Sequence, residues 1–184
     1  MIAKEEKQED GIMRKRTVIL LTSILLAYCT TVFAADLQYT ALYVGSNKAF
    51  VNDVEKQIDE QNKNVAVFVE NERSYVPVRF ISENYGGSVE WIPETQTVNI
   101  VFLDRAISLT IGINEIIIDG KKQELDVAPV IREERTFLPL RACTEAIGKE
   151  VFYSDGLILI SDIKDILDPR WDKDIVKLLI SHFE

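Results

Sequence analysis

The chain has 184 residues, 47% of them hydrophobic, and a formal net charge of −9 at pH 7. This length and apolar content suit one compact domain, or two small lobes that share a core. The acidic balance argues against non-specific binding to nucleic acid or anionic lipid, because such binding needs clustered cations.

The N-terminus has the pattern of an export signal. Basic residues at 14–16 precede an apolar stretch at 18–31, and Val32-Phe33-Ala34 offers a cleavage site. These three features together are typical of a secretory signal peptide. We therefore expect residues 1–34 to be removed by cleavage after Ala34, and the protein to be secreted or held at the cell surface.

Two alternatives concern this segment. An uncleaved anchor would meet the membrane through residues 17–35, because about 17–25 apolar residues can span a bilayer. Met13 is an alternative start to Met1, since the residues before it are mainly acidic and polar, which is unusual in a signal peptide.

Short β-rich runs alternate with turn residues through most of the remaining chain, which predicts antiparallel hairpins. Two helices interrupt the strands, and each has a proline at its expected first position and a glycine at its end. In chain order we predict strands at 42–44, 50–51, 65–69 and 75–76, a helix at 77–85, strands at 88–91, 97–101, 107–111, 115–118 and 130–131, a helix from Pro139 to Gly148, and strands at 150–153 and 157–160.

A C-terminal amphipathic helix is predicted within residues 165–184. Asp168 is expected as its N-cap and Pro169 as its first residue. We expect the helix to dock against a sheet edge, because a short isolated helix is marginal in water, while binding a partner is the alternative. Its apolar stripe comprises Trp171, Ile175, Leu178, Leu179 and Phe183.

One stretch of the sequence occurs twice. Residues 73–79 recur 62 positions later as residues 135–141, and nine of the 27 positions aligned from Val65 to Trp91 are identical. Such a repeat indicates a duplicated supersecondary unit. We therefore predict an α+β fold of antiparallel strands on short helices. Its 35–164 domain would hold two tandem pseudo-repeats, at about 42–104 and 105–162, followed by the C-terminal helix.

The residues that recur are interpreted as structural. In each copy an arginine and a glutamate lie four residues apart on the helix, so they can form an ion pair that pins the helix to the adjacent strand or turn. A ligand-binding arginine is the alternative. The strand aromatics are expected to be half-buried, with stacking on a sugar as the alternative. The recurring residues are Tyr75, Pro77, Arg79, Glu83, Gly86 and Trp91, and then Phe137, Pro139, Arg141, Glu145, Gly148 and Tyr153.

These motifs resemble the copper amine oxidase-like N-terminal domain, or stalk domain, of exported Gram-positive bacterial proteins. The resemblance rests on Tyr75-Val76-Pro77-Val78-Arg79, Glu83, Gly86-Gly87 and Val89-Glu90-Trp91, with their second copies, and covers about residues 42–162. It implies an antiparallel sheet wrapped on helices in an exported, non-catalytic module.

The residue content indicates no cofactor, no metal and no catalytic centre. Copper sites favour several imidazoles, whereas His182 is the only histidine in the chain. After cleavage Cys143 is the only cysteine, so no internal disulfide can form, and its alignment with Ile81 predicts a buried core position. The carboxylates are numerous, so a two-carboxylate hydrolase is left as the least favoured alternative.

The expected function is that of an exported, non-catalytic structural or binding module at the cell envelope. Its suspected partners are a cell-wall polymer or an extracellular protein. The alternative is a small secreted regulator or inhibitor of an extracellular enzyme.

Overall fold

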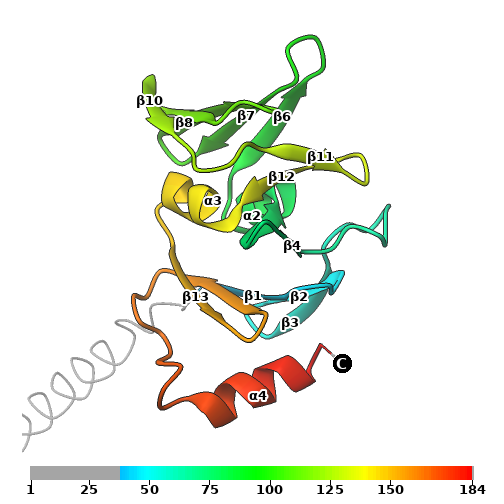
Figure 1. Ribbon diagram of the computed structural model, residues 1–184, viewed down its shortest axis with the longest axis vertical. Coiled ribbons are helices and arrows are strands. Elements are labelled where there is room, and N and C mark those ends of the chain that lie inside the picture. The colour runs from blue at the N-terminus through cyan, green and yellow to red at the C-terminus, as the bar shows by residue number, and fades with distance from the viewer. Residues whose placement is uncertain (1–37, 184) are drawn as a thin grey trace, which may run out of the picture. The chain divides into compact units, whose positions relative to one another are not determined.

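The computed structural model describes residues 38–183, so the predicted signal segment lies outside the described residues (Figure 1). Within 38–183, no helix combines the length and the apolar character needed to cross a membrane. The described part is α+β, with antiparallel strands and short helices, as the sequence predicted.

The strands and helices occur in two successive runs of the same order. The first run is β1 (Tyr39–Tyr43), β2 (Lys48–Val51), β3 (Val54–Gln57), β4 (Phe68–Glu70), β5 (Arg73–Pro77), α2 (Val78–Asn84), β6 (Ser88–Ile92) and β7 (Thr97–Phe102). The second run is β8 (Arg105–Thr110), β9 (Glu115–Ile118), β10 (Lys121–Glu124), β11 (Val130–Arg132), β12 (Arg135–Pro139), α3 (Leu140–Ile147), β13 (Glu150–Ser154) and β14 (Leu157–Ser161). The helix α4 (Lys173–Ser181) follows both runs.

The strands form three antiparallel sheets, and each sheet combines both runs (Figure 1). We call β13-β14-β1-β2-β3 the covered sheet, β10-β9-β8-β7-β6 the open sheet and β11-β12-β5-β4 the central sheet. Each five-stranded sheet takes three successive strands from one run and two from the other. The two runs meet where β1 pairs with β14 in the covered sheet and where β7 pairs with β8 in the open sheet.

The central sheet joins the two runs at β5 and β12. Val76 lies opposite Leu138, and both are fully buried. Pro77 and Pro139 end these strands and cap the helices that follow, so neither is the first helical residue as we had predicted. Their extended backbones keep them in the strand, and the helix begins one residue later.

The two helices end in the same way. The backbone N–H of Gly86 donates to the carbonyl of Glu83, and that of Gly148 donates to the carbonyl of Glu145. Both glycines have positive φ values, 84° and 69°, which a residue without Cβ adopts at little cost.

The main core lies where the inner faces of the sheets meet α2 and α3. Cys143 on α3 is 1% exposed, and burial raises the pKa of its thiol to about 12, so it is a core residue as predicted. The predicted strand at 65–69 is wrong in its bounds. Val65 and Val67 are buried, but the strand β4 begins only at Phe68.

The C-terminal helix begins later than predicted. Its N-cap is Asp172, and Asp168 lies in the turn before it. The carbonyl of Asp168 accepts from the N–H groups of Trp171 and Asp172, and the Asp172 carboxylate accepts from the N–H of Asp168. These contacts form a closed turn from 168 to 172, which places the start of the helix after it.

α4 docks on the outer face of the covered sheet, not on a sheet edge. Val176 is buried, and Leu179, Ile180 and Phe183 pack around the same apolar cluster. The Phe183 ring stacks on Tyr43 with centroids 5.7 Å apart and meets Phe50 edge-on at 5.2 Å.

The predicted apolar stripe of α4 is only half correct. Leu179 and Phe183 face the sheet, whereas Trp171 is 82% exposed and Ile175 and Leu178 are also exposed. Apolar residues lie on more than one side of this helix, so their spacing alone did not identify the face that packs.

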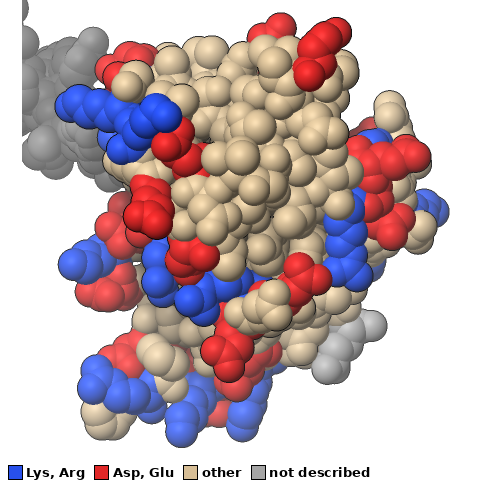
Figure 2. Space-filling view, turned by 45° about the horizontal axis from the view of Figure 1, so that its top comes forward, with Lys and Arg blue, Asp and Glu red and all other residues tan. Residues whose placement is uncertain are grey.

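The open sheet has no helix on its outer face within the described residues. Along β7, Val98 and Ile100 point into the core, whereas the alternate residues Thr97 and Asn99 are half-buried and Val101 is exposed. Figure 2 looks onto the end of the domain that carries this sheet, and a broad area in the upper part of that view has no charged side chains.

Candidate binding groove

A groove of about 970 Å³ lies between β3, α2, the open sheet and the hairpin β11–β12. Its walls come from segments that are distant in the sequence. The lining residues are Lys56–Gln61 and Val65, then Pro77–Phe80, Glu83 and Asn84, then Val89, Trp91 and Val98, and finally Ile131 and Glu134–Thr136.

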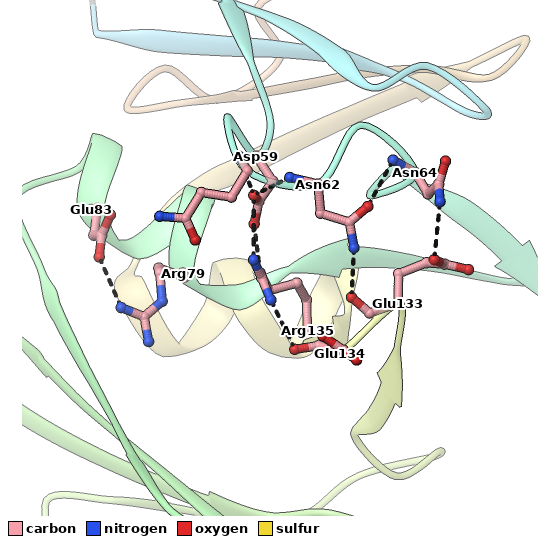
Figure 3. A network of polar contacts seen from close by, with 9 residues as sticks. Asp59, Asn62, Asn64, Arg79, Glu83, Glu133, Glu134 and Arg135 are labelled. Carbon is pink, nitrogen blue, oxygen red and sulfur yellow. Dashed lines mark hydrogen bonds and ion pairs between the residues drawn. The ribbon is translucent and has the colours of Figure 1, made fainter.

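One wall is the linker between β3 and β4, which is fixed to the tip of the hairpin β11–β12 (Figure 3). The Asp59 carboxylate accepts from Arg135 Nε at 2.5 Å and from the backbone N–H groups of Gln61 and Asn62, each at 2.9 Å. Asn62 Nδ2 donates to the carbonyl of Glu133 at 3.0 Å. The linker turn at residues 59–62 is therefore bonded to the hairpin at both its first and its last residue.

Within this network the charges of Asp59 and Arg135 compensate each other. The hydrogen bond from Arg135 is the main reason that the pKa of Asp59 lies below its ordinary value, although partial burial opposes the shift. The same bond raises the pKa of Arg135. The Arg135 side chain is 28% exposed and the Asp59 side chain 16%, so this ion pair is partly shielded from solvent.

Arg79 and Glu83 lie on the opposite side of the groove, on α2 (Figure 3). Their nearest charged atoms are 3.8 Å apart, and both side chains are more than half exposed. An exposed pair of this kind contributes little to stability.

The predicted helix ion pair is present in the first copy. Arg79 and Glu83 contact each other within α2, and among the described residues no ion pair joins either of them to a strand or turn. In the described part of the chain, Arg141 and Glu145 form no ion pair. The helices are instead held by buried apolar residues such as Val78, Ile81 and Leu140.

The ion pairs between residues distant in the sequence use a different arginine of each repeated motif. Arg135 pairs with Asp59, and Arg73 pairs with Asp126 at 2.5 Å. Sequence reasoning missed both pairs because the aspartates lie in linkers 76 and 53 residues away from their arginines. The one signal shared by the two aspartates is that each follows a single buried apolar residue, Ile58 or Leu125, directly after a largely polar strand.

The predicted site residues separate into three groups. The groove brings together Pro77, Arg79, Glu83 and Trp91. Tyr75 and Phe137 are buried in the core, where both contact the Phe68 ring, at 5.0 and 5.1 Å between centroids.

The remaining predicted residues lie outside the groove. They are Gly86, Pro139, Arg141, Glu145, Gly148 and Tyr153. Trp91 is half-buried and packs against the main core, whereas Tyr153 on β13 is 49% exposed. The two aromatic positions therefore differ in their surroundings, although they align in the sequence.

Residues 57–160, more than half of the chain, match the copper amine oxidase N-terminal domain family, and the chain belongs to that family. The match includes most of the groove and ends at β14, so α4 lies outside it. The N-terminal domain of copper amine oxidases is not their catalytic domain. No curated protein and no solved structure matches the chain.

The described residues contain no group of three or more His, Cys, Asp or Glu side chains placed to hold a metal ion.

Proposed function

We propose that this protein is an exported, non-catalytic module that binds a wall polymer or a partner protein at the cell envelope. The groove carries this proposal. It combines a half-buried tryptophan with charged and amide side chains along its walls, and ligand sites commonly pair apolar surface with a few polar groups.

The walls of the groove are built to keep their shape. The linker wall is fixed by the Asp59 network, and α2 is fixed by Val78 and Ile81, which are both buried. A site whose walls are already ordered loses little conformational entropy on binding, which favours recognition of a ligand. It does not by itself require any chemistry on that ligand.

We further propose that the fold arose from two copies of one unit. The elements from β4 to β6 and from β11 to β13 are offset by 62 residues, whereas β2 and β3 are offset by 67 residues from β9 and β10. The difference of five residues falls in the linker that forms the groove wall. The first copy therefore has the longer linker, and that linker lies at the candidate site.

Export and residence at the envelope are part of the proposal and rest on the signal-like segment at residues 14–34. The alternative function is a small secreted regulator or inhibitor that binds an extracellular enzyme. The same groove would then receive a segment of that enzyme.

Cell fractionation separates these functions. The chain is produced in a Gram-positive host with its own N-terminus, and membrane, wall and medium fractions are probed for it. We expect retention in the wall fraction and release by a wall-digesting hydrolase. Recovery from the medium alone would favour the secreted regulator, and recovery from the cytoplasm alone would contradict export.

A further inference from the structure

We infer that the groove binds a neutral glycan chain, with one pyranose ring stacked on Trp91. This inference rests on the proposed binding function and specifies the ligand. It is drawn from the charges that line the groove, from a buried acceptor that has no partner, and from the difference between this groove and the aligned positions beside α3.

The cations of the groove each have a partner, and carboxylates outnumber them. Arg135 is engaged by Asp59, Arg79 lies beside Glu83, and the ammonium group of Lys56 donates to Asn84 Oδ1 at 2.8 Å. Glu60 and Glu134 add two further carboxylates to the lining. A polyanion such as a phosphate polymer would need free, clustered cations. An uncharged ligand needs none, and its hydroxyl groups can add hydrogen bonds to side chains that stay paired.

One wall offers an acceptor that lacks a donor. Gln57 lines the groove, and among the described residues no group donates a hydrogen bond to its buried Oε1. A buried polar atom without a partner is unfavourable, so turning the Gln57 amide toward a ligand that supplies an O–H or N–H group would be favourable. Sugar hydroxyl and acetamido groups supply such donors.

The aromatic wall suits the apolar face of a sugar ring. Trp91 is half-buried, so the strand β6 and the core hold its ring in one orientation. Phe80 adds a second partly buried aromatic side chain to the lining. A fixed aromatic face beside hydrogen-bonding side chains binds a ligand that has both apolar C–H and polar O–H groups.

The counterpart in the second run lacks these features. Its residues at the aligned positions are Ala142 for Phe80, Ala146 for Asn84 and Tyr153 for Trp91. With the 67-residue offset, the exposed Glu124 takes the place of Gln57. The linker before β11 is also five residues shorter. The combination of Gln57, Phe80, Asn84 and Trp91 therefore occurs only beside α2 among the described residues, and Tyr153 provides a matched control position.

The first experiment uses Trp91 as its own reporter. The chain has two tryptophans, so a Trp171→Phe variant leaves Trp91 as the only one. This variant is titrated with the β-1,4-linked tetramer of N-acetylglucosamine and, separately, with polyglycerol phosphate. We expect a saturable change in Trp91 emission with the neutral tetramer and none with the phosphate polymer. A response to the phosphate polymer alone would overturn the inference.

The second experiment measures affinity for the same tetramer by calorimetry. Trp91→Phe and the double variant Arg79→Ala/Glu83→Gln should each bind about tenfold more weakly than the parent, whereas Tyr153→Phe should bind as the parent does. Arg79 and Glu83 are exposed, so the double variant should fold normally. Equal affinity in all variants would contradict the assignment to this groove.

The two proposals can fail separately. Wall retention without any binding of the tetramer would overturn the glycan inference and leave the proposed function in place. Tetramer binding without wall retention would support the inference and remove the envelope assignment. Loss of both would refute both.

Discussion

The covered sheet and the open sheet have corresponding strand orders, but their outer faces differ in character: the first is apolar and the second largely polar. On β14, Leu159 lies between Phe152 on β13 and Ala41 on β1, and α4 packs over them. At the same place in the open sheet, Asn99 lies between Glu90 and Ser108. The comparison shows that the helix, and not the sheet, determines which residues the outer face can carry.

The two runs differ a second time at their linkers. Both linkers place an aspartate against the arginine that begins β5 or β12. The Asp59–Arg135 pair is partly buried, whereas Arg73 and Asp126 are about half exposed. The longer linker forms a wall of the groove, whereas the shorter one connects β10 to β11 and does not line the groove. The candidate site thus lies at the linker that is longer by five residues.

The largest expected effect comes from exchanging the outer faces. Leu159→Asn places an amide under α4 and should lower the free energy of unfolding by about 3 kcal/mol, because apolar burial is lost and a polar group is buried. Asn99→Leu, its matched control, should change it by less than about 0.5 kcal/mol. Urea unfolding measures both values. Similar losses for the two variants would contradict the comparison.

Removal of α4 should have the next largest effect. Deletion of residues 168–184 exposes the outer face of the covered sheet and should lower the melting temperature by several degrees. The loss is partial because the main core on the other face is unchanged. Thermal unfolding checks this prediction. An unchanged melting temperature, with binding or oligomerisation lost, would favour a partner-binding role for α4.

A smaller effect separates the two linker aspartates. Asp59→Asn should cost about 1–2 kcal/mol, since it removes a charge-assisted hydrogen bond from a partly buried arginine. Asp126→Asn should cost clearly less, because its pair with Arg73 is exposed and screened by solvent. Urea unfolding of both variants against the parent checks the order. Equal losses would show that the longer linker contributes nothing to the difference.

The smallest expected effect is the dependence on pH. The folded-state pKa of Asp59 is lowered, so its contribution is complete above the ordinary carboxyl pKa of about 4 and is lost as the pH falls through the lower folded value. The stability difference between the parent and Asp59→Asn should therefore shrink between pH 7 and pH 3. A constant difference across this range would contradict the ion pair.

Local patterns predicted most of the strands and both inner helices. Alternating apolar residues identified β6 and β7, and Asp155-Gly156 predicted the turn between β13 and β14. The start of α4 was wrong because Asp168 and Asp172 carry the same local capping signal. Only the contacts in the folded turn distinguish them.

The candidate site depended on information that local patterns do not carry. Trp91, Arg79 and Glu83 were identified from the repeat, but their meeting with Gln57 and Asp59 requires the packing of β3 beside α2. The arginine pairings join residues 53 and 76 positions apart, which a periodicity cannot reveal. The pairing of β1 with β14, which are far apart in the sequence, could not be predicted from local patterns for the same reason.

The most direct test of the central claim is co-sedimentation of the chain with purified cell-wall sacculi. The parent, Trp91→Ala and Tyr153→Ala are compared at increasing amounts of sacculi. We predict saturable binding of the parent, binding weakened at least about tenfold in Trp91→Ala, and unchanged binding in Tyr153→Ala. Absence of binding by the parent, or equal losses in the two variants, would contradict a wall-binding groove that uses Trp91.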